Sequence, residues 1–330
     1  MGGPAKQAIL VTGGAGYVGS HACKALAKAG YVPVAYDSLI QGRRDLVKWG
    51  PLEVGDIQDA GRLTEVMDHW KPIAVMHFAG LIAVGDSVRD PISFYQSNVS
   101  GTFQLLDVMV KQGVGIFVFS SSASVYGDPV GSPIGEDSPT NPVNPYGRSK
   151  LMIEQALADA EKAYGLKWLA LRYFNACGAD PDCETGECHE PETHLIPRAL
   201  MAAAGDIPHL DVFGTDYPTP DGTCIRDYVH VTDLADLHVA ALESLKADEP
   251  SAALNLGTGT GNSILDVIKA VERVTGRTVP VRFEPRRSGD AIALVASPTL
   301  AQARFGIPPR YSDLETIIAN AWAWKLSDGK

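Results

Sequence analysis

A tyrosine and a lysine four residues apart form the pair with the clearest capacity for chemistry. They lie in the stretch Asn144-Pro145-Tyr146-Gly147-Arg148-Ser149-Lys150. Asparagine followed by proline is typical of a helix start, so the helix predicted from there places Tyr146 and Lys150 on one face. A phenol beside an ammonium group can serve as a general base, although an ordinary exposed pair has the same spacing.

Oxidation of an alcohol to a ketone is a reaction that suits this pair. The reaction needs a base for the hydroxyl proton and an acceptor for the hydride. The pKa of free tyrosine is about 10, too high for a base at neutral pH. Lys150, a cationic nicotinamide and the helix N-terminus would each lower it, and a shift of ~3 units needs about 4 kcal/mol. Ser122, which follows the apolar run 116–119, would hydrogen-bond and orient the reacting oxygen.

A glycine-rich turn near the N-terminus supplies a place for a dinucleotide. The stretch 11–19, Val-Thr-Gly-Gly-Ala-Gly-Tyr-Val-Gly, follows a strand-like run and precedes a helix-like one. Glycine lets the backbone approach a ligand closely, and the helix N-terminus attracts a pyrophosphate. The spacing Gly-x-x-Gly-x-x-Gly differs from the usual Gly-x-Gly-x-x-Gly fingerprint, and a glycine-rich turn without a ligand is the alternative. The expected cofactor contacts in this turn are Gly13, Gly16, Tyr17, Val18 and Gly19.

Asp37, at the end of the next predicted strand, favours NAD as the cofactor. It lies about 20 residues beyond the glycines, where a carboxylate can accept hydrogen bonds from the adenosine ribose. A carboxylate there would repel a 2′-phosphate, which disfavours NADP. Arg43 and Arg44 follow closely, and we interpret them as solvated loop charges.

Strand-like apolar runs alternate with helical patterns through the first half of the chain. This alternation predicts an α/β fold with a Rossmann-type, doubly wound parallel sheet. The predicted strands are 7–12, 32–36, 51–54, 73–78, 115–120 and 168–173. The predicted helices are 17–29, 60–70, 93–112 and 145–164.

The pattern changes after Asn175, where a loop-like stretch rich in Gly, Pro, Asp and Glu begins. Shorter helices and strands follow it, which predicts a second, smaller α/β domain. The predicted domains are 1–177 for NAD, with returning segments at about 228–256, and 178–227 with 257–330 for the smaller domain.

The returning segments are expected to rejoin the first sheet. They are Tyr228–Val231, its helix 233–245 and Leu254–Leu256. The run Gly257-Thr258-Gly259-Thr260-Gly261 looks like another phosphate loop. Ser263, with Asp266 three residues later, favours a helix cap there instead.

Composition and charge limit the classes of partner. The formal net charge of the 330 residues is −11 and no basic run occurs, so we expect no nucleic acid partner. No apolar stretch reaches the ~18–20 residues that span a bilayer, so we expect no membrane association and a cytoplasmic location.

The cysteines do not predict a disulfide framework, because their number is odd, at five, and they are dispersed. One cluster has residue types that suit zinc, but its spacings fit no common zinc pattern, so we predict no metal site. The residues of that cluster are Cys177, Cys183, Cys188, His189 and His194.

Several blocks of the sequence resemble the UDP-glucose 4-epimerase family, within the extended short-chain dehydrogenase/reductase superfamily. The shifted glycine spacing is the superfamily feature, and the other blocks match in order from about residue 8 to the C-terminus. Those blocks are His77–Gly80, Phe119–Gly127, Leu171–Asn175, Asp216–Thr223, Ile225–Val231 and Arg286–Asp290.

The resemblance implies an NAD that stays bound and an interconversion of UDP-glucose and UDP-galactose. Tyr146 takes the proton from the sugar 4-hydroxyl, the 4-keto sugar swings about its diphosphate, and hydride returns to the other face. Ser122 and Lys150 complete the catalytic group. Ser122, Tyr146 and Lys150 also contact the cofactor, and Ser122 and Tyr146 contact the substrate. The other implied cofactor contacts are Asp56, Ile57, Phe78, Ala79, Gly80, Ile82, Asn98 and Phe174. The other implied substrate contacts are Asn175, His194, Leu195, Phe213, Arg226, Arg287, Asp290 and Leu294.

Two positions depart from the family pattern. Relatives usually have a lysine that faces the cofactor at the position of Ile82. The position of Leu294 often holds a bulky tyrosine, or a small residue in relatives with broader specificity. We therefore expect weaker NAD retention and weak activity on the N-acetylated sugar pair.

Other activities remain open. An epimerase of UDP-uronic acid or UDP-pentose is the main alternative. A 4,6-dehydratase needs an acidic residue just after the strand-end hydroxyl, where this chain has Ala123, and a non-catalytic NAD sensor usually lacks the tyrosine or the lysine. The resemblance also implies a homodimer through helices near 98–112 and 146–163. The apolar residues compatible with that interface, or with packing on the sheet, are Val99, Phe103, Leu106, Val110, Ile153, Leu157 and Ala160.

Overall fold

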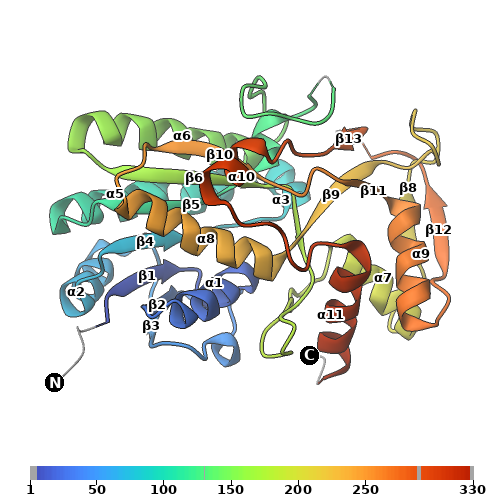
Figure 1. The fold of residues 1–330 in the computed structure, drawn as a ribbon, viewed down its shortest axis with the longest axis horizontal. Coiled ribbons are helices and arrows are strands. Elements are labelled where there is room, and N and C mark those ends of the chain that lie inside the picture. The colour runs from blue at the N-terminus through green and yellow to red at the C-terminus, as the bar shows by residue number, and fades with distance from the viewer. Residues whose placement is uncertain (1–5, 130, 288–290, 328–330) are drawn as a thin grey trace. The chain divides into compact units, whose positions relative to one another are not determined.

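The computed structural model describes residues 6–129, 131–287 and 291–327, which form two compact units (Figure 1). Unit 1 comprises Met1–Gly127, Thr140–Arg172 and Ala235–Leu254, and unit 2 comprises Asp128–Pro139, Tyr173–Leu234 and Asn255–Lys330. None of the described helices combines the length and apolar character that crossing a membrane requires.

Unit 1 is built on a seven-stranded sheet in the order β10-β6-β5-β4-β1-β2-β3. The pairs β1–β2, β2–β3, β1–β4 and β4–β5 are parallel. The chain runs outward from β1 on one side and returns to β4 on the other, so the predicted doubly wound fold is confirmed. The strands are β1 (Ala8–Thr12), β2 (Val32–Asp37), β3 (Leu52–Val54), β4 (Ala74–His77), β5 (Ile116–Ser122), β6 (Lys167–Tyr173) and β10 (Ala252–Leu256).

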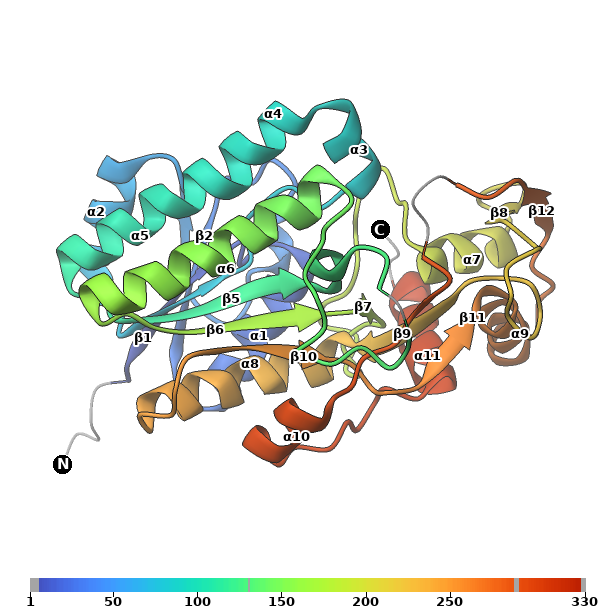
Figure 2. The ribbon, with the colours of Figure 1, turned by 90° about the horizontal axis from the view of Figure 1, so that it is seen from above.

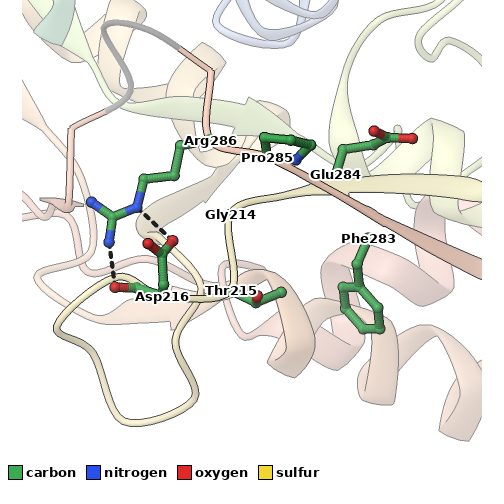
Figure 3. Close-up of a pocket in the computed structure, with 7 residues that line it drawn as sticks. All are labelled: Gly214, Thr215, Asp216, Phe283, Glu284, Pro285 and Arg286. Carbon is green, nitrogen blue, oxygen red and sulfur yellow. Dashed lines mark hydrogen bonds and ion pairs between the residues drawn. The ribbon is translucent and has the colours of Figure 1, made fainter.

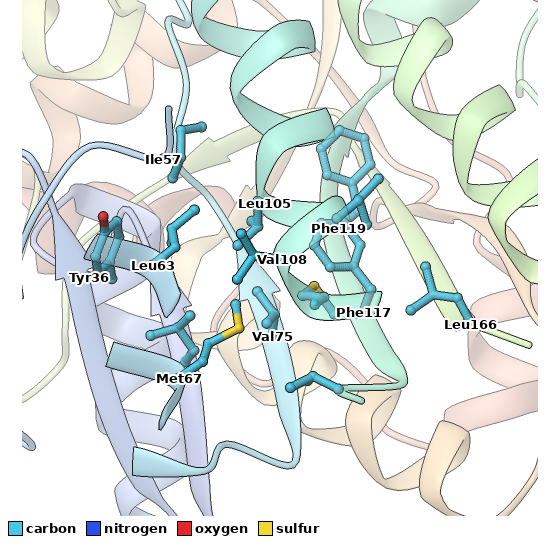
Figure 4. Packing of buried hydrophobic residues seen from close by; sticks show 14 of the residues in the cluster. Tyr36, Ile57, Leu63, Met67, Val75, Leu105, Val108, Phe117, Phe119 and Leu166 are labelled. Atoms are coloured by element: carbon cyan, nitrogen blue, oxygen red, sulfur yellow. The ribbon is translucent and has the colours of Figure 1, made fainter. Parts of the chain in front are cut away.

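Helices cover both faces of this sheet. Helices α5 and α6 lie side by side over one face, and α1 and α8 lie on the other (Figures 1 and 2). Apolar side chains of the sheet and of α2, α5 and α6 fill the core on the first face (Figure 4). The helices of this part are α1 (Tyr17–Lys28), η1 (Arg44–Leu46), α2 (Ala60–Trp70), α3 (Val84–Arg89), α4 (Pro91–Phe94), η2 (Tyr95–Ser100), α5 (Gly101–Gln112), η3 (Ala123–Tyr126), α6 (Pro145–Tyr164) and α8 (Val231–Lys246).

Unit 2 contains a small sheet, a two-stranded ribbon and helices around a second core. In the small sheet β9 pairs with β7, β11 and β13, and the ribbon joins β8 to β12. The strands are β7 (Asn175–Cys177), β8 (Leu210–Phe213), β9 (Ile225–His230), β11 (Gly261–Ser263), β12 (Val281–Glu284) and β13 (Ala293–Leu294). The helices are α7 (Leu195–Ala204), α9 (Ile264–Thr275), α10 (Thr299–Phe305) and α11 (Leu314–Leu326).

The expected return of Tyr228–Val231 to the first sheet is wrong. These residues form the end of β9, which pairs within the small sheet of unit 2, and the start of α8. Leu254–Leu256 do join the first sheet, as the end of its edge strand β10. The predicted helix 93–112 is also interrupted, because Tyr95–Ser100 is a π-helix between α4 and α5.

The glycine-rich run 257–261 is not arranged as a phosphate loop. The buried carboxylate of Asp227 accepts hydrogen bonds from the backbone N–H groups of Thr258, at 2.9 Å, and Gly259, at 3.0 Å. Ser263 and Asp266 form the predicted capping box at the start of α9. The amides of this run are therefore occupied by the protein's own carboxylate.

His77, at the end of β4, is buried between two hydroxyls. Its Nδ1 lies 2.6 Å from Thr12 Oγ1 and its Nε2 lies 2.8 Å from Thr102 Oγ1. Burial, with the nearby Lys150 charge, lowers the pKa of His77 to about 3. Between about pH 4 and pH 6.5 the imidazole is therefore neutral in the folded chain, whereas it becomes protonated in the unfolded chain.

This difference predicts a loss of stability in mild acid. Because the folded pKa is depressed below the unfolded value of about 6.5, the unfolded chain binds the extra proton and stability falls as the pH falls from 6.5 toward 3. Between about pH 6.5 and pH 5 the cost is about 2 kcal/mol. His77→Gln, which cannot titrate, should show a shallower decline in urea unfolding free energy over this interval. Equal declines in the two proteins would contradict the assignment to His77.

Candidate active site

The glycine turn after β1 is shaped by close backbone contacts. Gly13 has a φ of +73°, and a Cβ there would lie 2.6 Å from the backbone nitrogen of Ala79. A Cβ on Gly19 would lie 2.1 Å from the carbonyl oxygen of Gly13. Helix α1 begins at Tyr17 without a side-chain cap on its first amides. The turn thus brings bare backbone and a helix N-terminus together at the end of β1, as a bound pyrophosphate requires.

Asp37 lies at the end of β2 and is tied to this turn. Its Oδ2 accepts a hydrogen bond from the Ala15 N–H, at 3.0 Å, and its Oδ1 accepts one from the Leu39 N–H, at 2.9 Å. Burial raises the pKa of Asp37 above its ordinary value, against these two hydrogen bonds. The Arg43 guanidinium forms an ion pair with Asp45 at 2.7 Å. These positions agree with a carboxylate that is held toward the cofactor turn and with Arg43 as a loop charge.

Asp56 is exposed and bonds to a nearby backbone amide, whereas Ile57 packs in the core. Asp56 Oδ1 accepts a hydrogen bond from the Gln58 N–H at 2.9 Å. Ile57 is buried, and its side chain fills the space beside Gly101, where a Cβ would lie 2.7 Å from Ile57 Cδ1. A contact of either residue with adenine stays a prediction.

Asn98 fixes the loop that leaves β4. Its Oδ1 accepts a hydrogen bond from the Leu81 N–H, at 2.8 Å, and its Nδ2 donates to the Leu81 carbonyl, at 2.9 Å. Gly80 has a φ of +151°, and a Cβ there would lie 2.9 Å from Asn98 Oδ1. Asn98 belongs to the π-helix, a form that often occurs at functional sites. Phe78 packs against His238 with ring centroids 4.9 Å apart, and Ile82 is 37% exposed.

The three predicted catalytic residues lie together at the carboxyl end of β5. Ser122 is the last residue of β5, and α6 begins at Pro145 with Asn144 as its cap, as predicted. Ser122 forms a hydrogen bond with the Tyr146 side chain. Lys150 Nζ donates to the Ser120 carbonyl at 2.8 Å and lies 5.7 Å from the centroid of the Tyr146 ring. Hydroxyl, phenol and ammonium groups thus converge where parallel sheets bind their ligands.

The electrostatics of this group leave the phenol protonated in the protein alone. Burial raises the pKa of Tyr146, against the lowering effect of the Ser122 hydrogen bond. Burial lowers the pKa of Lys150 to about 8, although the Glu154 charge opposes that shift. Additional positive charge close to Tyr146 is therefore needed before it can act as a base near neutral pH, and a bound nicotinamide cation carries such a charge.

A buried ion pair behind this group was not predicted from the sequence. Arg172 of β6 donates to Glu154 of α6 through Nε, at 3.0 Å, and Nη2, at 2.6 Å. Glu154 also accepts a hydrogen bond from Ser121, and Arg172 donates to the Tyr126 hydroxyl at 2.8 Å. The available signal was the position of Glu154, one helical turn beyond Lys150 on the same face.

Apart from Ser122, Tyr146 and Asp290, the residues predicted to contact the UDP-sugar lie in unit 2, on several different elements. The guanidinium of Arg287 lies over the Phe213 ring, 4.7 Å from its centroid. Leu294 of β13 stands opposite Arg226 of β9 in the strand register, and Arg226 Nη1 donates to the Ala291 carbonyl at 2.9 Å. The structure therefore brings together two pairs of the predicted residues.

The other predicted contacts in this unit lie on separate elements. Asn175 begins β7, while His194 caps α7 and Leu195 is its first residue. The Phe174 N–H donates to the Leu256 carbonyl at 3.3 Å. Asp290 lies outside the described residues.

A cavity of about 500 Å³ lies at the carboxyl ends of β8 and β12 (Figure 3). Arg286 lines it, donates to Asp216 Oδ1 at 2.7 Å, and lies over the Tyr217 ring at 4.1 Å. Arg286 and Asp216 belong to blocks that matched the family, yet they were not predicted as contacts. The remaining lining residues are Gly214, Thr215, Phe283, Glu284 and Pro285.

Comparison with known proteins identifies the class to which these features belong. A family model described as the NAD dependent epimerase/dehydratase family matches residues 9–257. The chain belongs to this family, and the prediction of NAD as the cofactor is confirmed.

Particular relatives narrow the class further. The chain is 51% identical to the UDP-glucose 4-epimerase of Rhizobium leguminosarum bv. trifolii, over 97% of this chain and 98% of the relative. A crystal structure of UDP-glucose 4-epimerase from Brucella ovis in complex with NAD is 54% identical, with a TM-score of 0.94 and coverage of 96% and 98%. That of UDP-glucose 4-epimerase from Bifidobacterium longum, in complex with NAD+ and UDP, is 38% identical, with a TM-score of 0.92 and coverage of 97% and 98%. The predicted family resemblance is confirmed.

The apolar side chain of Ile82 leads to a prediction about NAD retention. A lysine at this half-exposed position should add a charge-assisted hydrogen bond to the cofactor, so Ile82→Lys should bind NAD about tenfold more tightly. The measurement is the dissociation constant of NAD by titration calorimetry, with the NAD content of the purified chain. Val84→Lys is a matched control, because Val84 is an exposed apolar residue of the same segment. Equal affinities of Ile82→Lys and wild type would overturn the prediction.

Proposed function

We propose that this chain interconverts UDP-glucose and UDP-galactose by transient oxidation at C4 of the hexose. The observation that carries the proposal is the convergence of Ser122, Tyr146 and Lys150 at the carboxyl end of β5. The full-length similarity to UDP-glucose 4-epimerases supports the choice of substrate.

The residues of unit 1 fit the cofactor. Gly13 and Gly19 leave room for close approach of a pyrophosphate to the backbone, and the Asp37 carboxylate suits ribose hydroxyls. Phe78, Ala79 and Gly80 would line the nicotinamide side of the site. Bound there, NAD would supply the acceptor, and afterwards the donor, of the hydride at C4 of the sugar.

Each catalytic residue has a distinct task in this proposal. Tyr146 Oη removes the proton from the 4-hydroxyl and later returns it to the same oxygen. Ser122 Oγ hydrogen-bonds that oxygen and holds it in line with the phenol. Lys150, fixed by the Ser120 carbonyl, keeps a positive charge within reach of the Tyr146 ring and stabilises the phenolate.

Unit 2 is proposed to hold the UDP-sugar. Arg226 and Arg287 would bind the diphosphate, since a planar guanidinium matches phosphate oxygens in two places at once. Phe213 would stack on uracil, and Asp290 would accept hydrogen bonds from the ribose. A firm hold on UDP with few contacts to the hexose would let the 4-keto sugar turn over between the two hydride transfers.

A homodimer is part of the proposal, and burial limits which residues can form it. Phe103 and Val110 of α5 are 45% and 36% exposed, so they are available to a partner helix. Leu106, Ile153 and Leu157 are buried in the core of unit 1 and pack on the sheet instead.

Removal of the proposed base is the direct test of the function. Tyr146→Phe keeps the ring and removes only the hydroxyl, so turnover should fall by roughly 10²–10⁴-fold. The assay follows UDP-glucose formed from UDP-galactose without added NAD. Tyr164→Phe, an exposed tyrosine at the other end of α6, should leave turnover unchanged. Unchanged turnover in Tyr146→Phe would reject the mechanism, and no turnover by wild type would favour the UDP-uronic acid or UDP-pentose alternative.

Leu294 provides a test of sugar specificity. A tyrosine ring at this position would crowd the sugar 2-position and exclude an N-acetyl group, whereas leucine should exclude it only in part. Wild type should convert the N-acetylated pair weakly, and Leu294→Tyr should lower kcat/KM for that pair relative to UDP-galactose. Leu300→Tyr, at an exposed leucine of unit 2, is the control. An unaltered ratio in Leu294→Tyr would show that Leu294 does not control the sugar range.

A further inference from the structure

The segment just before α7 brings two glutamates and two histidines together. Glu187, His189, Glu192 and His194 each offer one nitrogen or oxygen atom, and these four atoms all lie within 4.8 Å of one another. His189 Nδ1 lies 2.9 Å from Glu187 Oε1. His194 Nδ1 lies 2.7 Å from the same oxygen and 2.9 Å from Glu192 Oε1.

The two carboxylates of this cluster are largely withdrawn from water. The side chains of Glu187 and Glu192 are 8% and 10% exposed, and that of His189 is 24% exposed. Both carboxylates face His194 Nδ1, yet one N–H group has only one proton to donate. A cation among the four atoms would be ligated by both carboxylates at once and would neutralise their charge.

The segment is held in place from outside the cluster. The Trp324 indole N–H of α11 donates to the Glu187 carbonyl at 3.1 Å, and Gly186 lies so close to Trp324 that a Cβ would be 2.4 Å from the ring. Within the cluster, Glu192 Oε1 accepts a hydrogen bond from the backbone N–H of His194 at 2.7 Å. Arg198 of α7 also donates to the Glu192 carbonyl at 3.4 Å. Backbone positions fixed by α7 and α11 are what a preorganised metal site needs.

We propose that Glu187, His189, Glu192 and His194 form a structural zinc site. Two imidazole nitrogens and two carboxylate oxygens are a donor set that suits zinc, whereas magnesium and calcium prefer oxygen ligands alone. Ligand atoms at about 2.0–2.2 Å from one ion lie roughly 3.3–3.6 Å apart in a tetrahedron. The hydrogen-bonded separations of 2.7–2.9 Å would open by about half an ångström on metal binding, and the wider separations, all within 4.8 Å, would close toward the tetrahedral value. Four protein ligands leave no open position, so the ion would tie the loop to α7 and take no part in the reaction.

This site differs from the zinc cluster that the sequence brought into question. None of the cysteines of that cluster, Cys177, Cys183 or Cys188, belongs to the group of four within the described part of the chain. The two glutamates take their place, and their spacing, Glu-x-His-x-x-Glu-x-His, was not considered. The proposal therefore keeps His189 and His194 of the earlier cluster and departs from the prediction of no metal site.

Metal binding by the full chain, purified without a metal-binding tag, tests the proposal. After treatment with a chelator, the protein should bind one equivalent of Zn²⁺ by mass spectrometric metal analysis. Zinc at about a hundredfold above its Kd should raise the Tm by about 5–10 °C. Magnesium and calcium should not compete. Absence of tight zinc binding, or equal binding of magnesium, would overturn the proposal.

Variants locate the binding. Glu187→Gln and His189→Gln should each weaken zinc binding by about 100-fold or more, whereas Glu190→Gln, an exposed glutamate of the same segment, should retain it. His189→Gln alters a partly exposed side chain and keeps the test open if Glu187→Gln fails to fold. Cobalt in place of zinc should give the visible absorption of a tetrahedral complex in wild type and lose it in both variants. Zinc retained by both variants would place it elsewhere and overturn the proposal. The measurement is independent of epimerase turnover, so either proposal can fail alone.

Discussion

The buried ion pair between Glu154 and Arg172 is the constraint on which the catalytic geometry depends. It joins α6, which carries Tyr146 and Lys150, to β6, and its hydrogen bond to Ser121 reaches β5 beside Ser122. Loss of one partner of such a pair costs about 3–5 kcal/mol, because the other charge is left buried. A shift of α6 relative to these strands is thus penalised, so the pair fixes Tyr146 and Lys150 relative to Ser122.

Unit 2 also contains a buried carboxylate, but its partners are backbone amides and not an arginine. The buried Asp227 carboxylate of β9 binds the N–H groups of Thr258, Gly259 and Ala296. One carboxylate therefore fixes two loops that flank the small sheet. A buried carboxylate thus fixes a helix against two strands in unit 1 and two loops in unit 2.

Local sequence patterns predicted much of unit 1, because the residues that begin and end its helices and strands lie close together in the sequence. Asn144-Pro145 set the start of α6 and hence the face shared by Tyr146 and Lys150. Strand pairing is different: Ile225–His230 is recognisable as a strand, but nothing within it specifies which sheet it joins. The Glu154–Arg172 pair and the cluster before α7 were missed for a related reason. The Glu154–Arg172 pair joins residues 18 positions apart through the core. The cluster before α7 combines glutamates and histidines at a spacing that no common metal-binding pattern predicts.

Two glycines of the turn after β1 are needed by the fold itself, independently of any ligand. Gly13 and Gly19 are required by the protein's own backbone, since a side chain at either would collide with Ala79 or with the Gly13 carbonyl even without a ligand. Gly16 is less constrained, because a Cβ there would meet only the Gly13 carbonyl oxygen, at 3.2 Å. A descendant that lost catalysis would therefore still keep glycine at 13 and 19 in order to fold. Retention of glycine at positions 13 and 19 is therefore evidence for this backbone arrangement and not, by itself, for activity.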